Sequence, residues 1–310
     1  GKFDKNDFIA FYGQGPVKWK LNTADNRFHH QLNLYSDSTF YFINIDGAAG
    51  KRILPQAGSS LSPSNTATTF DDYQFYEDER QNFIKSGREW FGKQFDVDPD
   101  QSFKFNFPHL TKTVPVYVQS EFAGRTFNTN VFFDLSYNGT PINKLKVTSF
   151  FSNYLSDFCA LASSIQGNSI SKTFNATTDD VAIDVKFTRT SSNANGWLNY
   201  IEMNATRDLI FTGSQMFFRN KESAGAGKVT NFIITTSSSN NIRLWDVTSH
   251  DNVFEQQFNS NGGNINFVVA TDSLREYVLF SESEYKEPLF GRKVENQNIH
   301  AEAIPKMVIV

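Results

Sequence analysis

The 310-residue sequence has little of what several classes of protein require. Its one cysteine, Cys159, excludes an internal disulfide but does not decide the compartment. No apolar run approaches the ~20 residues that a membrane-spanning helix needs. The net charge is -4, and the sequence has no basic run of the kind that binds nucleic acid. No signal peptide opens the chain, and its start, GKFDKNDF, is typical of the interior of a longer protein.

Motifs that would indicate an enzyme are also missing. The sequence has no Gly-x-Ser-x-Gly, no phosphate-binding loop and no dinucleotide fingerprint. Gly225 and Gly227 lack the spacing and the following helix of a nucleotide motif, so a flexible loop is predicted there. Cys159 stands among apolar neighbours, which favours a buried core residue over a thiolate nucleophile. We therefore assign no catalytic and no cofactor-binding residue.

The five histidines do not form an obvious site. His29 and His30 are adjacent, and on a strand their side chains would point to opposite faces, so they could not easily share one metal ion. We expect one of them to be half-buried and hydrogen-bonded, and the other to be exposed. His109, His250 and His300 are isolated in the sequence and are interpreted as structural.

Two acidic segments are candidates for cation sites. The first comprises Asp71, Asp72, Glu77, Asp78 and Glu79. It keeps no ligand spacing, which favours a solvated face over a cation site.

The second acidic segment, DVDPDQ, imitates the start of a calcium loop with Asp96, Asp98 and Asp100. Gln101 and Phe107 replace the glycine and the glutamate that an EF-hand needs, so the pattern fails. The proline in the segment favours a simple turn. Bound calcium stays an open alternative on the count of oxygen ligands alone, and no metal ligand is assigned.

The sequence is rich in aromatic side chains and in segments where apolar residues occupy every second position. It contains 32 phenylalanines, and aromatic residues suit a pleated, half-buried surface. Residues 181–188 alternate large apolar side chains with small or polar ones, the clearest strand pattern in the chain. Further strands are predicted at residues 39–45, 102–107, 116–122, 130–137, 232–236, 242–247, 265–270 and 277–281. A helix is considered only at residues 154–165.

These elements indicate a mainly β protein of two packed antiparallel units, the second a jelly-roll-like β-sandwich. A change of domain is predicted near residues 108–115, giving an N-terminal β-rich domain (1–112) and a β-sandwich (113–292). Residues 293–310 would be a linker ending in an apolar strand, 307–310, of a kind that is covered on both faces in a parallel sheet.

Residues 196–219 are predicted to form an apolar hairpin-like unit. Two strands would flank a polar turn at residues 206–208, with Trp197, Ile201 and Met203 on one face of the first strand. The apolar positions change parity at Gly213 and Ser214, as they do at a β-bulge. Such a unit needs a second sheet to cover it.

Several segments carry a family resemblance. They are GWLNYIEMNA and GSQMFFR within residues 196–219, FYGQGPVKW, FHHQLNLYSDSTFYF and SGREWFG before them, and LWDVT, LREYVLF and NQNIHAEAIPKMVIV after them. Together these collinear segments resemble the sortases of the type IX secretion system, within the gingipain-type cysteine peptidases. The resemblance gives His29 and His30 no defined role.

The resemblance implies the non-catalytic β-rich region of a cysteine endopeptidase that would be inactive alone. The catalytic His and Cys would lie downstream, in a caspase-like α/β domain whose first strand is 307–310. The whole protein would act at the outer membrane surface of a Gram-negative bacterium. There it would remove C-terminal sorting domains from secretion cargo and help attach the cargo to lipopolysaccharide. Implied partners are its catalytic domain, the cargo and an outer-membrane secretion protein. A surface adhesin or a carbohydrate-binding β-sandwich is the alternative.

Overall fold

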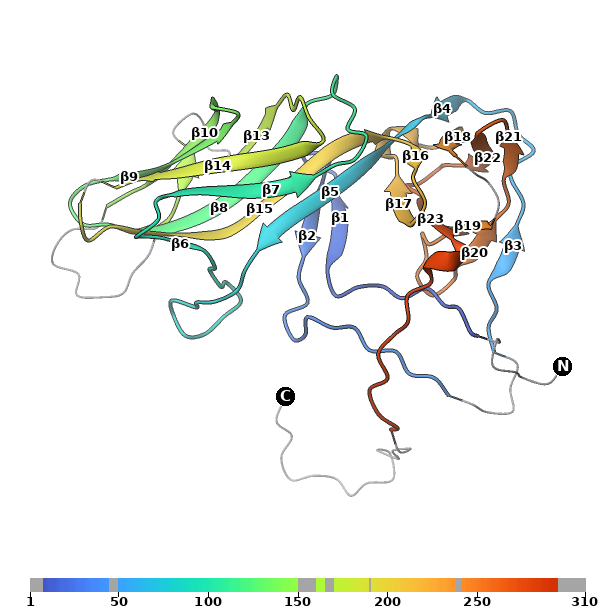
Figure 1. The fold of residues 1–310 in the computed structure, drawn as a ribbon, viewed down its shortest axis with the longest axis horizontal. Coiled ribbons are helices and arrows are strands. Elements are labelled where there is room, and N and C mark those ends of the chain that lie inside the picture. Colours follow the sequence, from blue (N-terminus) through green and yellow to red (C-terminus); the bar gives the residue numbers. More distant parts are fainter. Residues whose placement is uncertain are drawn as a thin grey trace.

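The computed structural model describes residues 8–44, 50–149, 160–164, 170–189, 191–237 and 241–294. Within these residues the protein is built from strands, and its helical elements are two 3₁₀ turns, η1 (Lys221–Ser223) and η2 (Glu282–Glu284). None of the helical elements described is long or apolar enough to cross a membrane. Figure 1 shows two sandwiches side by side, with a separate hairpin below the first.

The first sandwich packs a five-stranded sheet against a six-stranded one, and all its strand pairs are antiparallel. The five-stranded sheet contains β7 (Asp100–Asn106), β9 (Val131–Tyr137), β10 (Thr140–Val147), β12 (Ser163–Ser164) and β14 (Asp180–Thr188). The six-stranded sheet contains β5 (Thr69–Glu77), β6 (Gln94–Phe95), β8 (Val116–Arg125), β11 (Ala160–Leu161), β13 (Ser171–Phe174) and β15 (Asn195–Asp208). Alternating apolar residues of both sheets fill the core, as the pattern at residues 181–188 predicts.

The second sandwich pairs two five-stranded sheets. One contains β4 (Asn65–Ala67), β16 (Ile210–Phe211), β18 (Val229–Thr236), β21 (Asn259–Asn261) and β22 (Asn264–Ala270). The other contains β3 (Leu54–Gln56), β17 (Gln215–Arg219), β19 (Ile242–Asp246), β20 (Phe254–Gln256) and β23 (Glu276–Ser281). The pairs β4–β18, β16–β18 and β3–β20 are parallel, so the expectation of two purely antiparallel units is wrong for this one.

The sheets do not follow the predicted boundary at residue 112. Strand β7 lies before that boundary, yet it pairs with β14 after it. Strands β3 and β4 come early in the chain, yet both belong to the second sandwich. The loop around residues 108–115 therefore connects the two sheets of the first sandwich. The chain reaches the second sandwich before β5 and again after β15.

Residues 196–219 are not a hairpin. Residues 206–208, the predicted turn, end the long strand β15 and pair with β5. The chain then enters the other sandwich, where β16 and β17 lie in opposite sheets. The change of parity at Gly213 and Ser214 is therefore a passage between two sheets that cover the same core, and not a bulge.

A bulge does occur inside β15, where the register shifts between Leu198 and Tyr200. It turns Trp197 away from Ile201 and Met203, which lie in the main core. Trp197 packs instead with Phe91 in a small separate cluster. The single face predicted for these three residues is wrong, because one extra residue reverses the alternation of side chains.

Two other local predictions differ from the structure. Residues 160–161 and 163–164 are short strands, so the helix considered at 154–165 is wrong there, and its remaining residues lie outside the described part. The described residues of the segment 39–45 form no strand, and Phe40 and Phe42 are exposed. The predicted strand 307–310 lies outside the described residues.

Candidate functional site

The outer face of the six-stranded sheet carries a polar and aromatic array. Three neighbouring strands align in register, so that each residue from 200 to 204 of β15 stands between one residue of β8 and one of β5. The rows are Tyr117–Asn204–Tyr73, Gln119–Glu202–Phe75 and Glu121–Tyr200–Glu77. These residues alternate with core residues such as Ile201 and Met203, so they point away from the sandwich interior.

A hairpin of β1 (Lys18–Asn22) and β2 (Arg27–Gln31) covers this array (Figure 1). The side-chain amide of Asn204 receives the backbone N–H of Phe28 at 2.7 Å and donates to its carbonyl at 2.8 Å. The Phe28 ring is 1% exposed and meets Tyr73 at 5.4 Å. Trp19 also stacks on Tyr73, with ring centroids 4.1 Å apart. The hairpin is thus held by the buried Phe28 ring and by the Asn204 amide, which bonds to the backbone of Phe28 as a neighbouring strand would.

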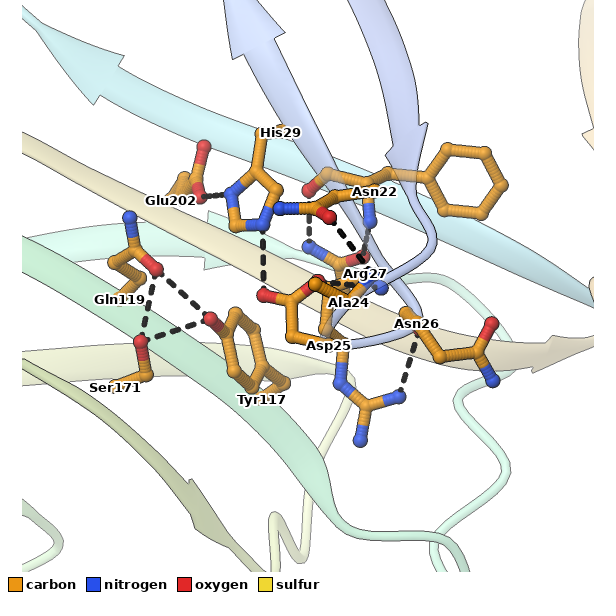
Figure 2. Close-up of polar contacts among 12 residues, drawn as sticks. Asn22, Ala24, Asp25, Asn26, Arg27, His29, Tyr117, Gln119, Ser171 and Glu202 are labelled. Atoms are coloured by element: carbon orange, nitrogen blue, oxygen red, sulfur yellow. Dashed lines mark hydrogen bonds and ion pairs between the residues drawn. The ribbon is translucent and has the colours of Figure 1, made fainter. Parts of the chain in front are cut away.

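Beside this anchor, two histidines and three carboxylates form one chain. Glu202, 1% exposed, accepts from Nδ1 of His29 with one oxygen and from Nδ1 of His30, at 2.6 Å, with the other. The Nε2 atom of His29 contacts Asp25 in the hairpin turn at 2.9 Å, and that of His30 contacts Glu77 on β5 at 2.6 Å. Figure 2 shows His29 between Asp25 and Glu202, next to the hydroxyl and amide groups of Tyr117, Ser171 and Gln119.

The chain of contacts favours the charged form of both rings. Burial alone would lower the pKa of His30, but its hydrogen bonds to Glu202 and Glu77, with the charges of those carboxylates, outweigh burial and raise the pKa to about 9. Burial also opposes the charge on His29, and Asp25 and Glu202 together raise its pKa above the ordinary value. Both shifts favour ion pairs between the rings and the carboxylates.

A cavity of about 550 Å³ opens next to the network. Both histidines, Glu77 and Glu202 line it, together with Glu79 and Arg88. No nucleophilic serine, threonine or cysteine lies among its lining residues in the described part of the chain. The arrangement can exchange protons and hold a charged side chain, but it lacks the nucleophile–base pair of a peptidase.

The structure brings His29 and His30 together on one carboxylate, which the sequence did not predict. Both are half-buried, with side chains 24% and 7% exposed, so the expectation that one is exposed is wrong. The two rings reach different oxygens of the same carboxylate, so adjacent residues meet at Glu202. In the residues described, no group of three or more His, Cys, Asp or Glu has an arrangement that could hold a metal ion.

The remaining candidate residues are scattered. His109 adopts a positive φ of 59°, and its backbone N–H donates to Asp179 at 2.8 Å. His250 stacks on Tyr12 with ring centroids 5.8 Å apart. Asp96 forms an ion pair with Arg189 at 3.0 Å. Cys159 and His300 lie outside the described residues.

The acidic segment before residue 80 is a solvated face only in part, because Glu79 is exposed but three other members are paired. Asp71 is 8% exposed and bonds to the ammonium group of Lys221 at 2.5 Å. Asp72 pairs with Arg207 at 2.7 Å, and Glu77 belongs to the histidine network. The acidic residues of strand β5 therefore form specific ion pairs.

Glu202 is the residue that the sequence reasoning missed. A signal was present, because Glu202 and Asn204 alternate with Ile201 and Met203 in an otherwise apolar strand. Two polar residues at strand spacing indicate a polar face. The sequence gives no indication of which distant segment covers that face.

The protein was compared with known proteins. No protein-family model matches the sequence, and no curated protein matches it. Among solved structures, the chain is similar to dimeric latent PorU from Porphyromonas gingivalis, with a TM-score of 0.75 and 20% identity. The match covers 95% of this chain and 28% of the PorU chain, so this chain spans less than a third of that protein. At this identity the similarity shows a shared fold.

Two carbohydrate-binding modules also match. One is the CBM36-1 domain of a multidomain xylanase from the hindgut metagenome of Trinervitermes trinervoides, with a TM-score of 0.27, 12% identity, and coverage of 43% of this chain and 96% of the module. The other is a CBM36 module in complex with calcium and xylotriose, with a TM-score of 0.25, 12% identity, and coverage of 44% and 99%. TM-scores this low carry no argument about fold or ligand.

Proposed function

We propose that this chain is the β-rich, non-catalytic region of a PorU-like sortase. One observation carries the proposal: the similarity to the PorU structure covers 95% of the chain, and so extends over both sandwiches. The collinear sequence segments that resemble type IX secretion sortases support it independently. In this proposal the second sandwich is jelly-roll-like, and residues 293–310 lead into a caspase-like catalytic domain.

In the proposed role, the region is a scaffold that packs against the catalytic domain and helps position cargo or an outer-membrane partner. The whole protein would remove C-terminal sorting domains and help attach cargo to lipopolysaccharide at the cell surface. In the described residues, the rings of His29 and His30 bind carboxylates and the ring of His250 contacts an amide. This pattern supports a scaffold, because a catalytic histidine must be directed at a nucleophile or at substrate.

The proposal is tested with the 310-residue chain and a reporter protein that ends in a type IX sorting domain. We expect no cleavage of the reporter above a heat-denatured control, and binding of the reporter to immobilised chain in a label-free assay. A reporter with its sorting domain deleted is the matched control for binding. Cleavage that disappears in Cys159→Ala would overturn the non-catalytic assignment, and equal binding of both reporters would overturn the cargo role.

A carbohydrate-binding protein is the second candidate, and one observation favours it. A cavity of about 790 Å³ lies between the N-terminal arm, the hairpin and the loop at His250. Tyr35, 93% exposed, and Tyr41, 43% exposed, line it together with Lys18 and Lys20. Aromatic faces beside polar groups suit sugar rings. Saturable binding on a glycan array, lost in Tyr35→Ala and Tyr41→Ala, combined with no binding of the sorting domain, would favour this function.

A further inference from the structure

The β1–β2 hairpin is held on the first sandwich by side chains. In the described residues its two strands pair only with each other, so they extend no sheet of either sandwich. Its attachments are the Asn204 amide on Phe28, the stack of Trp19 on Tyr73, and the histidine network. An element held in this way can leave the surface without breaking the sheets beneath it.

The histidine network has a built-in proton requirement. All four ring nitrogens of His29 and His30 face carboxylate oxygens, which can only accept hydrogen bonds. Four such contacts need four N–H donors. A neutral imidazole has one N–H, so loss of a proton leaves a nitrogen lone pair directed at a carboxylate. Each deprotonation therefore replaces an ion pair by a repulsive contact.

The buried end of the network makes this requirement strong. Glu202 is 1% exposed, and the two histidines of the hairpin are its cationic partners. An ionised carboxylate that loses its cation while it stays buried carries a large desolvation penalty. Release of the hairpin returns that carboxylate to water. Separation of the hairpin therefore costs less free energy when the rings are neutral.

We propose that the β1–β2 hairpin is a proton-operated latch, seated on the six-stranded sheet while His29 and His30 are protonated and released when they lose their protons. The direction follows from the raised pKa values of both rings. The stabilisation of docking by the protonated rings is fully present when the pH is below the ordinary histidine pKa of about 6.5. It is lost as the pH rises through the pKa of the docked rings, which is about 9 for His30.

The other titratable or charged groups around the rings fit this direction. They are Asp25 in the hairpin turn, Glu77 on β5, Glu202 and Tyr200 on β15, Tyr117 on β8, and Glu79 and Arg88 at the cavity. Burial raises the pKa of Tyr200 and of Tyr117, so neither phenol gains charge before the histidines lose theirs. His29 and His30 are the groups in this set whose pKa is raised from an ordinary value of about 6.5.

Release would uncover a defined surface. Tyr73 and Phe75 would lose the cover of Trp19 and His30, and Asn204 would lose both of its bonds to Phe28. A face with aromatic rings, an amide and a carboxylate would then be exposed to solvent. The latch therefore controls access to the outer face of this sheet.

Hydrogen exchange measured by mass spectrometry on the full 310-residue chain tests the proposal. Amides of residues 18–31 are followed from pH 6 to pH 9.5, corrected for the intrinsic exchange rate, with β14 of the first sandwich as internal reference. We expect protection of the hairpin to fall by on the order of 10²-fold, since a rise in the pKa of His30 from 6.5 to about 9 sets the ratio of the docking constants. Protection of β14 should stay constant.

Glu202→Gln keeps the shape of the side chain and removes its charge. We expect this variant to lose most hairpin protection already at pH 6 and to show a flat pH profile. The matched control, Asp134→Asn, removes a carboxylate that pairs with Lys144 on the other sheet, and it should behave as the wild type. If Glu202→Gln does not fold, nitrogen chemical shifts of the histidine rings in the wild type decide, because they report protonation directly.

Two results would overturn the proposal. One is hairpin protection that is unchanged from pH 6 to pH 9.5, or that falls only together with β14. The other is a ring nitrogen spectrum in which His29 and His30 are neutral at pH 7 while the hairpin is protected.

Discussion

Gly196 opens the segment GWLNYIEMNA, and its close packing provides a sharp test of the core. It is buried at the start of β15, where a Cβ atom would lie 2.6 Å from Cζ of Phe133 and 3.0 Å from Cε2 of Phe187. Real Cβ atoms do not approach other atoms to 2.6 Å, so the Phe133 ring must move. Gly196→Ala is therefore an overpacking substitution.

The ring has little room to move. Phe133 stacks on Phe122 with centroids 4.4 Å apart and meets Phe187 at 4.8 Å and Phe95 at 5.4 Å. Overpacking of a core by one carbon costs about 1–3 kcal/mol. The rigid aromatic surroundings place Gly196→Ala toward the upper end, at about 2–3 kcal/mol. In urea denaturation followed by circular dichroism, this loss of stability should lower the denaturation midpoint by roughly 1 M, for an ordinary dependence of the unfolding free energy on urea concentration.

A matched control and a rescue define the outcome. Gly15→Ala places a Cβ where no atom lies within 4 Å, and we expect no change in stability. Phe133→Leu removes the clashing ring atoms, so the double variant should be less destabilised than the sum of the single ones. If Gly196→Ala differs from Gly15→Ala by less than about 0.5 kcal/mol, the packing described for this core is incorrect.

Two further substitutions test the contacts between elements. Asp71→Ala leaves the ammonium group of Lys221 without its partner at the junction of the sandwiches. The free energy of unfolding, measured by urea denaturation, should fall by about 3 kcal/mol. An unchanged denaturation midpoint would show that the pair contributes nothing to stability. Phe28→Ala removes the hairpin anchor, so trypsin should cleave after Arg27 at least ten times faster while the unfolding temperature of the sandwiches stays constant. Equal cleavage rates in wild type and variant would contradict side-chain anchoring of the hairpin.

Much of the fold could be predicted where alternation is local. The predicted strands at residues 116–122, 181–188, 265–270 and 277–281 are confirmed as parts of β8, β14, β22 and β23. Their alternating residues fill the two cores. The similarity to part of PorU likewise agrees with the family resemblance seen in the sequence. The alternation of apolar and polar residues involves only neighbours in the chain, and it arises wherever one face of a strand is buried.

The candidate site could not be predicted in the same way. Glu202 acquires its role from His29 and His30, which lie more than 170 residues earlier in the chain. The pairing of β15 with β5 and β8, and the bulge next to Leu198, decide which side chains share the outer face. A sequence pattern contains no information on the register between distant strands.

The sequence by itself determined that this protein is a β protein with two aromatic cores, because the spacing of apolar residues fixes which side chains each strand can bury. Only the tertiary structure decided that two adjacent histidines share one buried glutamate under a separate hairpin. That arrangement depends on strand register and on the docking of distant segments, which are set by the free energy of the whole fold and not by any one stretch of it.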